Sequence, residues 1–458
     1  MQINSSAVKE FRKGFTGEII VPDDPAYEET RKIFNAMIDK RPGVIAQCAN
    51  VDDVVRSVRF GRSQGLEIAV RGGGKGLAGE ALTNGGLVID LRRMNSVSVD
   101  PGAGIVTVAG GATMRQLDLA TESYGLATTG SRSSTTGVGG FILNGGDGWL
   151  SRKMGLTCDN LLAVELVTAD GRLDRACKDE NPELFWALHG GGGNFGVATS
   201  FTLRLHELPL VTAMILLWSP ESGPEVLRAY RDFIASAPDE IGGGALYLTG
   251  PDGDFVPRHL VGGLMFAVLV AYAGPLAEAR EVANPLFKLA HEAESVKQMT
   301  YAELQCLFDD PQGYRSSWSP VYLNSLPDDA IDLFRLRADE MIVPSPSRQA
   351  LLPQGGAINS GNFDYPVPWR HSFWSVHSLG MWSDPAGDEN GSQWVEGFST
   401  DLKPWTLEAV YPSFFFEDES VNRAIAYFGW DDYHRLARVK AKYDPDNVFH
   451  LNRNIKPD

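Results

Sequence analysis

Glycine clusters constrain this chain more than any other feature of its sequence. They fall between Arg71 and Gly196, in five groups at 72–74, 110–111, 137–140, 145–148 and 190–193. Because glycine has no side chain, its backbone can approach another group closely and can adopt conformations that other residues avoid. Five groups in one region are more than tight turns alone require, and we expect them to form loops that cradle a ligand.

Two of these clusters match the dinucleotide fingerprint G-x-G-x-x-G, at 74–79 and at 191–196. A Rossmann loop of this type follows a strand and opens a helix, so that the helix N-terminus faces the pyrophosphate. Here the first match lies between two predicted strands, and the second follows a predicted helix and opens a strand. A glycine-rich loop can still bind phosphate through successive backbone N–H groups. We therefore expect phosphate binding without a Rossmann fold.

The rest of the pattern predicts an α+β protein. In the first two hundred residues, short apolar and β-branched runs between turn residues predict strands, and two stretches predict helices. The predicted strands are 66–70, 87–91, 105–109, 162–168 and 197–205, and the predicted helices are 51–64, capped by Asn50, and 182–188. Past about Glu207, strands at 211–218 and 264–272 flank a helix that Pro224 opens. This alternation is typical of a sheet covered by helices.

Two later stretches have their own signatures. Residues 344–370 are rich in Pro, Gly, Ser and Asn, and we expect a long loop there, of the kind that compact domains keep for function. Residues 433–442 have Leu436 and Val439 on one face and precede Asp444-Pro445. This pattern predicts a helix that ends before the proline.

Composition limits the classes of partner. The 458 residues suffice for two or three domains, and no apolar run approaches the ~20 residues that span a bilayer. The 41 Lys and Arg against 58 Asp and Glu give a net charge of −17, which repels nucleic acid and anionic lipid. We expect a small-molecule substrate and neither nucleic acid nor membrane as partner, and leave the oligomeric state open.

Cysteine and histidine usage narrows the setting further. Four cysteines without a C-x-x-C pair indicate reduced thiols, and the first residues lack the apolar stretch of a secretory signal. We expect a cytoplasmic protein. The eight histidines include no H-x-x-x-H pair, so the sequence predicts no metal site.

The glycine clusters and their neighbours, in their order along the chain, resemble the FAD-linked oxidases of the berberine bridge enzyme type. The resemblance covers roughly residues 38–208 and 409–456. It rests on Arg71–Gly76, Gly86–Leu91, Gly137–Gly140, Gly148–Lys153, Leu184–Val197 and Tyr443–Ile455. It implies the two-domain PCMH-type FAD-binding fold of the vanillyl-alcohol-oxidase superfamily, whose substrate domain is an antiparallel sheet covered by helices. The expected segments are an FAD-binding domain at 1–207, a substrate domain at 208–407, and a C-terminal segment at 408–458 that returns to the FAD-binding domain.

The resemblance also implies which residues bind FAD. The nest at Arg71–Gly76 suits the pyrophosphate, and the later glycines permit close approach by a long cofactor. The predicted cofactor-binding residues are Arg71, Gly72, Gly73, Gly74, Lys75, Gly76, Ser133, Thr136, Gly137, Gly140, Gly146, Val197 and Asn452. Glycines used only for turns, and a valine and an asparagine used only for packing, are the alternative interpretation.

The first departure from the family concerns flavin attachment. Many relatives bind the flavin covalently through a histidine in R-x-G-G-H and through a cysteine four residues before the G-x-G-G glycines. Those positions hold Lys75 and Ser133 here. A protonated amine and a hydroxyl are poor substitutes for an imidazole and a thiolate. We therefore predict non-covalent FAD; a solvated lysine and a turn-forming serine are the alternatives.

The second departure concerns catalysis. Family members usually carry a Y-x-N-Y or Y-x-N-F motif whose last aromatic is often the tyrosine that deprotonates substrate, and the matching stretch ends in Phe414. Phe414 cannot accept a proton. His377 lies where bacterial relatives often have glutamine, on one strand face with Ser375, and can titrate near neutrality. We predict His377 or Tyr411 as the catalytic base; a hydrogen-bonded core histidine and a core aromatic are the alternatives.

The sequence thus favours an FAD-dependent oxidoreductase of a small aromatic or natural-product-like substrate. Thr136 occupies the position thought to gate oxygen in relatives, so oxidase and dehydrogenase behaviour stay open. The alternative is a flavoprotein that retains FAD without redox turnover and catalyses a cyclisation or isomerisation, motivated by Phe414. A ligand-binding protein without catalysis ranks last.

Overall fold

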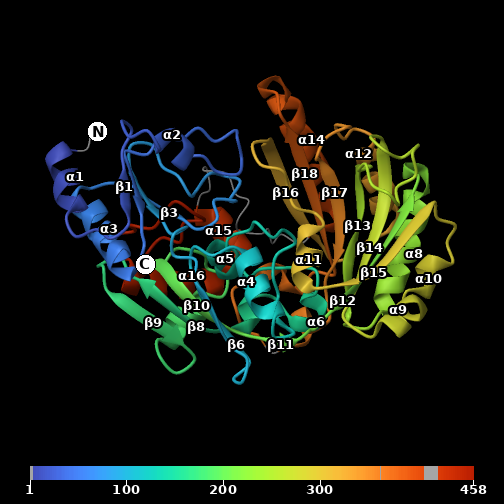
Figure 1. Cartoon of the computed structure of the whole chain (residues 1–458), viewed down its shortest axis with the longest axis horizontal. Helices are drawn as coiled ribbons and strands as arrows, with labels where there is room; N and C mark the ends of the chain where they lie inside the picture. Colours follow the sequence, from blue (N-terminus) through green and yellow to red (C-terminus); the bar gives the residue numbers. More distant parts are fainter. Residues whose placement is uncertain (1–3, 362, 407–420) are drawn as a thin grey trace.

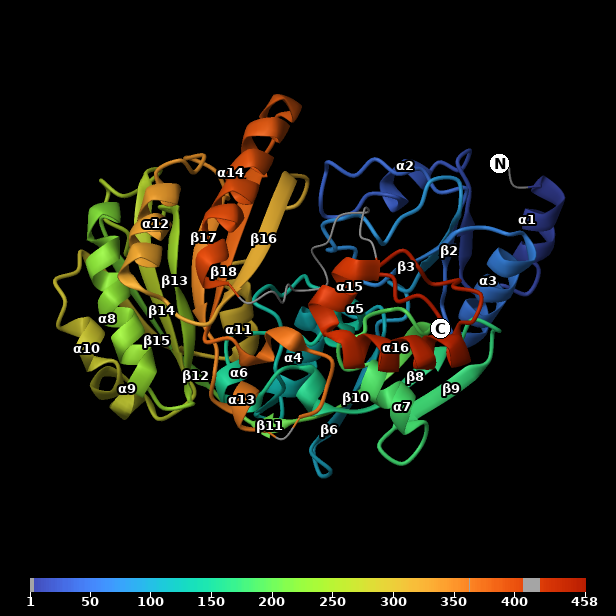
Figure 2. The ribbon, with the colours of Figure 1, turned by 180° about the vertical axis from the view of Figure 1, so that it is seen from behind.

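The computed structural model describes residues 4–361, 363–406 and 421–458. Its two halves lie side by side, with the glycine-rich loops and helices α4 to α6 near their junction (Figures 1 and 2). The first half contains the sheets formed before residue 208, and the second contains one large sheet with its helices. This is the two-part α+β architecture that the resemblance implies.

The N-terminal sheet has the strand order β1-β2-β4-β3. Its strands are β1 (Glu18–Ile20), β2 (Val44–Gln47), β3 (Ile68–Arg71) and β4 (Leu87–Asp90), with β2 and β3 both parallel to β4. Helix α3 (Val51–Ser63) begins where predicted, because the Asn50 side chain accepts a hydrogen bond from the amide of Asp53. Its apolar face packs against this sheet in one hydrophobic cluster, together with α1 (Ser5–Arg12).

The second sheet of this half is antiparallel, with the order β5-β6-β10-β8-β9. Its strands are β5 (Val97–Asp100), β6 (Ile105–Ala109), β8 (Leu161–Val167), β9 (Leu173–Cys177) and β10 (Val197–Arg204), and a short pair joins β7 (Leu126–Ala127) to β11 (His206–Glu207). The helices near it are α4 (Met114–Glu122), α5 (Val138–Leu143), α6 (Ser151–Met154) and α7 (Pro182–Ala187). Gly171 forms the β8–β9 turn with φ +75°, which few other residues adopt.

The second half is built on an antiparallel sheet, in which the described residues form seven strands of order β15-β12-β14-β13-β17-β18-β16. The strands are β12 (Val211–Trp218), β13 (Ile241–Thr249), β14 (Leu264–Tyr272), β15 (Ala293–Met299), β16 (Arg315–Leu323), β17 (Arg348–Pro353) and β18 (Trp374–Trp382). Its outer face is covered by helices α8 (Gly223–Ser236), α9 (Leu276–Val282), α10 (Asn284–Phe287) and α12 (Asp328–Ala338), and α14 (Asp388–Asp401) packs against β16 and β18 (Figure 1). The inner face meets the first half through α6 and α11 (Tyr301–Cys306), which contribute Met154 and Leu304 to a shared cluster.

The chain then returns to the first half (Figure 2). Helices α15 (Val421–Phe428) and α16 (Trp430–Tyr443) lie there, and α16 packs against α7. The Lys440 ammonium is fully buried and donates to Asp444 at 2.6 Å, to the carbonyl of Asn194 at 2.8 Å and to that of Phe449 at 2.9 Å. One buried cation therefore ties α16 to the last glycine cluster and to the segment after α16.

One predicted element is wrong. Residues 344–370 do not form a single long loop, because β17 runs through the middle of the sheet between β13 and β18, and the short helix α13 (Ala357–Ser360) follows. The strand has an apolar centre, Ala350-Leu351-Leu352, that the surrounding Pro, Gly and Ser residues obscured. By contrast, β6, β12 and β14 have the predicted bounds.

Within the described ranges, no helix is both long and apolar enough to cross a lipid bilayer.

Candidate active site

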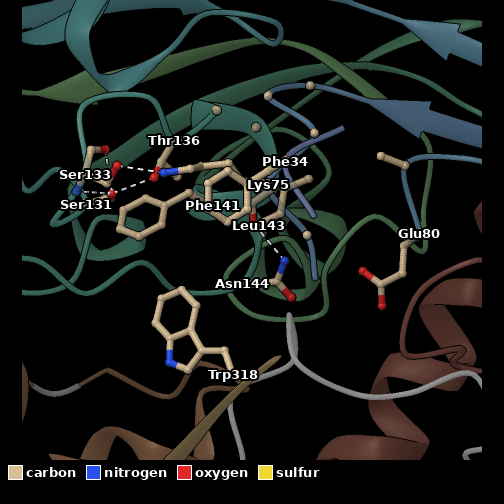
Figure 3. Close-up of a pocket in the computed structure, with 18 of the residues that line it drawn as sticks. Phe34, Lys75, Glu80, Ser131, Ser133, Thr136, Phe141, Leu143, Asn144 and Trp318 are labelled. Carbon is tan, nitrogen blue, oxygen red and sulfur yellow. Dashed lines mark hydrogen bonds between the residues drawn. The ribbon is translucent and has the colours of Figure 1, made fainter. Parts of the chain in front are cut away.

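A cavity of about 340 Å³ lies where the two halves meet. Backbone from the glycine clusters forms one wall, and side chains from β13, β16, β17 and β18 form the opposite wall. Seven Phe, Trp and Tyr residues among those described line it: Phe34, Phe141, Trp149, Phe308, Trp318, Tyr322 and Phe449. Figure 3 shows Trp318 across from the loop that bears Lys75. The cavity thus combines bare backbone on one side with flat apolar surfaces on the other.

The glycine wall depends on two loops that touch through their backbones. A Cβ added at Gly73 would lie 2.4 Å from the amide nitrogen of Gly137, and one added at Gly137 would lie 2.2 Å from that of Gly73. Gly74 adopts φ +69°, which favours glycine. The amides of 73–76 donate to no other residue in the part of the chain that the structure describes. Unpaired amides in successive residues are what an anion-binding nest requires, so the predicted binding of phosphate by this loop stays open to test.

Arg71 does not contribute its side chain to the nest. Its guanidinium donates to the backbone carbonyls of Thr30, at 2.5 Å, and Lys32. Burial, reinforced by the nearby Arg92, lowers the pKa of Arg71 to about 10. The side chain therefore holds the segment after α2 (Tyr27–Thr30), and cofactor binding by Arg71 through its backbone N–H stays a prediction.

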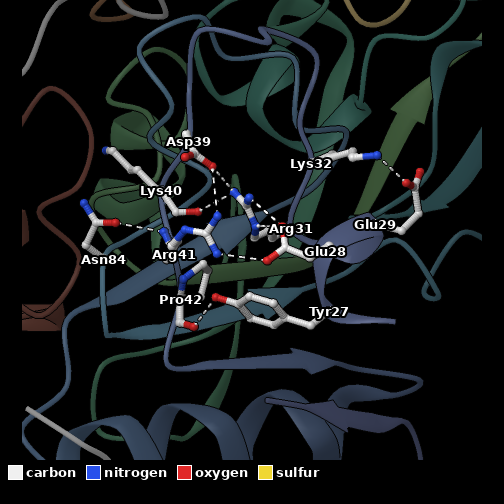
Figure 4. A network of polar contacts seen from close by, with 10 residues as sticks. All are labelled: Tyr27, Glu28, Glu29, Arg31, Lys32, Asp39, Lys40, Arg41, Pro42 and Asn84. Carbon is white, nitrogen blue, oxygen red and sulfur yellow. Dashed lines mark hydrogen bonds and ion pairs between the residues drawn. The ribbon is translucent and has the colours of Figure 1, made fainter. Parts of the chain in front are cut away.

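That segment, residues 31–42, contributes Phe34 to the cavity lining, and we call it the strap. Figure 4 shows the contacts that fix its base: Arg31 bonds to Glu28 at 2.6 Å and to Asp39 at 2.5 Å, and Arg41 bonds to Glu28 at 2.9 Å. Further along, the Asn35 amide group donates to the carbonyls of Leu77 and Ser316. The strap therefore joins the first half to β16 of the second.

Lys75 is not a solvated charge. Its ammonium donates to Ser133 Oγ at 2.7 Å and to Asp310 at 3.3 Å, and it lies over the Phe34 ring (Figure 3). Burial lowers the pKa of Lys75, while Asp310 opposes the shift. Asp310 also pairs with Arg348 of β17 at 2.7 Å. The two positions that carry covalent anchors in relatives thus bond to each other here and to the second half.

The other predicted cofactor residues divide into two groups. Those that line the cavity are Gly72, Gly73, Gly74, Lys75, Gly76, Ser133, Thr136, Gly137, Gly140 and Asn452. Two do not line it: Gly146 packs against Thr157 and Phe141, and the Val197 side chain is buried in the core beneath α3. Gly146 adopts φ +77°, as the turn interpretation expects, and the Val197 side chain packs in the core; cofactor contact through the Val197 backbone stays a prediction.

His377 lines the cavity from β18, and its ring lies 5.4 Å from that of Trp318. Burial, reinforced by the Arg132 charge, lowers the pKa of His377 to about 3. The pKa of His377 thus lies well below the near-neutral range that we expected, and its role as the catalytic base stays a prediction. Tyr411 and Phe414 lie outside the described residues.

Sequence reasoning missed a second polar group beside His377. The Arg132 guanidinium donates to Asp147 Oδ2 at 2.8 Å, and the Gln354 side-chain amide donates to the same oxygen at 2.9 Å and to Ser375 Oγ at 3.2 Å. Arg132, Asp147 and His377 all line the cavity. A signal was present for Asp147, because a carboxylate interrupts the glycine cluster 145–148.

The cavity residues fit FAD. Gly140 presents open space, since an added Cβ would meet nothing within 4 Å, and the amides of 73–76 offer donors for a pyrophosphate. At the same wall, the buried Oδ1 of Asn452 has no hydrogen-bond partner among the residues that the structure describes, and a ligand that supplied one would remove this cost. Among the described residues, no group of three or more His, Cys, Asp or Glu side chains is suited to a metal ion.

Comparisons with known proteins agree with this site. Residues 42–176 match the family model of an FAD-binding domain, and residues 400–456 match the model described as berberine and berberine-like. The (R)-6-hydroxynicotine oxidase of Paenarthrobacter nicotinovorans is 31% identical, over 96% of this chain and 97% of its own length. An FAD-linked oxidoreductase of Bacillus subtilis, YgaK, is 28% identical over 96% of this chain and 97% of its own.

Solved structures give the same result. The crystal structure of 6-hydroxy-D-nicotine oxidase from Arthrobacter nicotinovorans has a TM-score of 0.85 and 28% identity, and covers 97% of this chain and 99% of its own. BBE-like 1 from Physcomitrella patens has a TM-score of 0.85 at 22% identity, over 96% of this chain and 97% of its own, and shows the fold alone.

Proposed function

The chain belongs to the FAD-linked oxidoreductases of the berberine bridge enzyme type, and on this premise we propose that it oxidises a small, flat, uncharged molecule with non-covalently bound FAD. The observation that carries the proposal is the two-sided cavity, with a bare glycine backbone facing aromatic side chains. Large aromatic surfaces favour flat apolar ligands. Similar proteins include a hydroxynicotine oxidase and a chitooligosaccharide oxidase, and the aromatic walls of this cavity favour an aromatic substrate over a sugar.

In the proposed reaction, different cavity residues would bind the cofactor and orient the substrate. When bound, FAD supplies the hydride acceptor. The amides of Gly73–Gly76 would hold the pyrophosphate of FAD. Asn452, in the segment after α16, would accept a hydrogen bond from the cofactor. Trp318 and Phe308 would orient the substrate ring and exclude water. His377, neutral at physiological pH, would accept a hydrogen bond from the substrate's N–H or O–H group.

We propose that Lys75 and Ser133 bind FAD without covalent bonds. The 2.7 Å bond between Lys75 and Ser133 occupies both side chains, and neither is a strong nucleophile. Acid or heat denaturation of the purified holoprotein, followed by centrifugation, tests this directly. All of the flavin is expected in the supernatant, and flavin that stays on the precipitated polypeptide would contradict the proposal.

We also propose the segment boundaries 1–207, 208–407 and 408–458, because the strands of the large sheet that the structure describes all lie between residues 211 and 382. The four cysteines are free thiols, which supports a reducing, cytoplasmic setting. Thr136 lines the cavity and accepts a hydrogen bond from Ser131 at 2.8 Å. Whether oxygen or another acceptor reoxidises the flavin is left to the experiment below.

Anaerobic mixing of the holoprotein with candidate substrates tests the function. Uncharged aromatic alcohols should bleach the flavin band near roughly 450 nm, whereas mono- and oligosaccharides should not. Readmission of air then separates an oxidase, whose band returns within the turnover time, from a dehydrogenase. Product formed without any bleaching would contradict redox turnover and favour a cyclase or isomerase.

A further inference from the structure

Several cavity-lining side chains carry buried polar atoms that have no hydrogen-bond partner within the described ranges, and three of these atoms lie in the polar group around His377. These are the Oδ1 of Asp147, the Nε of Arg132 and the Nε2 of His377. Asp147 is 8% exposed. A buried donor or acceptor that stays unpaired loses the hydrogen bond it makes with water, which costs about 1–3 kcal/mol for each group. Three such atoms around one cavity indicate groups that a ligand completes.

The polar group is held rigidly from several elements. Arg132 bonds to the carbonyls of Asp147 and Gly148, both at 3.2 Å, besides its ion pair with the Asp147 carboxylate. Gln354 fixes the same carboxylate through Oδ2, which leaves Oδ1 as the unfilled acceptor. These contacts restrict both side chains to one orientation, so a ligand must match them rather than rearrange them.

The charges in this group cancel. Arg132 and Asp147 form a 2.8 Å ion pair, and His377 is neutral at physiological pH. The Arg132 guanidinium also lies 5.5 Å from the Trp149 ring, an aromatic wall of the same cavity. A charged ligand would leave one excess charge in this enclosed space, whereas an uncharged ligand with both a donor and an acceptor fills all positions.

We propose that Arg132 and Asp147 form a substrate subsite that selects an uncharged planar ring bearing a hydrogen-bond donor beside an acceptor on one edge, as in a cyclic amide. The carboxylate of Asp147 takes the donor, and Arg132 donates to the adjacent acceptor. This inference rests on the proposed function, because it assigns the specificity of the same cavity. It adds the chemical pattern that the aromatic walls alone do not define.

The test uses two probes that differ only in the substituent on one ring nitrogen. Holoprotein is titrated with 2-quinolone and with N-methyl-2-quinolone, in which a methyl group replaces the donor, and binding is measured by calorimetry and by perturbation of the flavin spectrum. Because the donor's partner is buried, wild-type protein is expected to bind 2-quinolone roughly tenfold or more tightly than its N-methyl analogue. The Arg132→Met/Asp147→Leu variant replaces the pair with apolar side chains of similar size, which buried pairs often tolerate.

In that variant the ratio of the two affinities is expected to fall to within about threefold, since both hydrogen-bond partners are gone. Asp147→Asn is the second variant, and it keeps the test possible if the double variant fails to fold. Its ratio of the two affinities should also fall. The matched control is Arg337→Met/Asp401→Leu, which removes an ion pair from the helices of the second half and should keep the wild-type ratio.

Two results would overturn the subsite: equal binding of both probes by wild-type protein, or a ratio that survives in both Asp147 variants. Loss of FAD from Asp147→Asn with an unchanged probe ratio would also overturn it, because the unfilled atoms would then belong to the cofactor. A wild-type preparation that binds no flavin contradicts the proposed function instead, and calorimetry with the two quinolones still decides the subsite.

Discussion

Asp310 neutralises two cations at the cavity wall, which makes its replacement an informative perturbation. Its carboxylate lies 3.3 Å from the Lys75 ammonium and 2.7 Å from the Arg348 guanidinium. The side chain of Asp310 is 6% exposed, that of Lys75 14% and that of Arg348 20%. Asp310→Asn keeps the shape and removes the charge, so two buried cations then lie in one cluster without the carboxylate they share.

The expected loss of stability follows from these contacts. Breaking a buried ion pair by removing one partner costs about 3–5 kcal/mol. Lys75 keeps its hydrogen bond to Ser133, and Arg348 reaches solvent in part, so we expect the lower value, about 3 kcal/mol. An unfolding entropy of about 2.1 cal/mol/K per residue gives about 1 kcal/mol/K for this chain length. The melting temperature should therefore fall by about 3 °C if both halves unfold together.

Thermal melts of the holoprotein at pH 7, followed by circular dichroism and by flavin release, measure this loss. Lys75→Met/Asp310→Asn removes one of the two cations as well and should melt above the single variant. Asp401→Asn is the control, because its partly exposed pair with Arg337 is worth under about 1 kcal/mol. Our reasoning is refuted if Asp310→Asn melts within 1 °C of wild type, or if the double variant melts below the single one.

Three other changes have defined outcomes. Gly73→Ala should abolish FAD loading, measured as bound flavin per protein, because the added Cβ would meet the Gly137 backbone. The control is Gly102→Ala, whose Cβ would meet a side-chain oxygen at 3.5 Å, and this variant should load fully. The pKa of His377 is lowered to about 3 from 6.5, so the unfolded state binds the proton first and acid destabilises the fold between these values. His377→Asn should flatten the plot of melting temperature against pH between pH 3 and 6.5. A neutral His377 would be contradicted if the wild-type rate of flavin reduction changed near pH 6.5 and this change were lost in His377→Asn. Burial raises the pKa of Asp118 to about 8 despite the hydrogen bond from Gln305, so stability is lost as pH rises from 3.8 to 8, and Asp118→Asn should melt higher than wild type at pH 8 but not at pH 4.

Local patterns were enough to predict much of the fold. Strands such as Val211–Trp218 are continuous apolar runs between turn residues, so their bounds follow from the sequence. The helix at Val51–Ser63 follows from its Asn50 cap. The strand Arg348–Pro353 was not predicted, because the Pro, Gly, Ser and Asn content of residues 344–370 indicated a loop. These six residues form a strand by pairing with β13 and β18, which are distant in sequence.

The part of the candidate site formed by glycine backbone could be predicted from the sequence. The part formed by side chains that are distant in sequence could not. The glycine loops identify the cofactor wall because absence of a side chain is itself visible in a sequence. The partners of Lys75 are not visible, since Asp310 lies 235 positions away and reaches it only after the two halves pack. The same holds for His377, whose pKa depends on enclosure and on Arg132 rather than on its neighbours in sequence.

The return of the chain to the first half sets an order of events during synthesis. The core of that half includes Tyr427, Leu436 and Ile455, and the cavity wall includes Asn452, so neither is complete when Gly196 has been made. At ordinary elongation speeds of about 5–20 residues per second, the 256 residues from Gly196 to Asn452 take roughly 13–50 seconds. For that interval the nascent first half exposes an unfinished apolar surface, and flavin capture must wait until translation has passed the last of these residues.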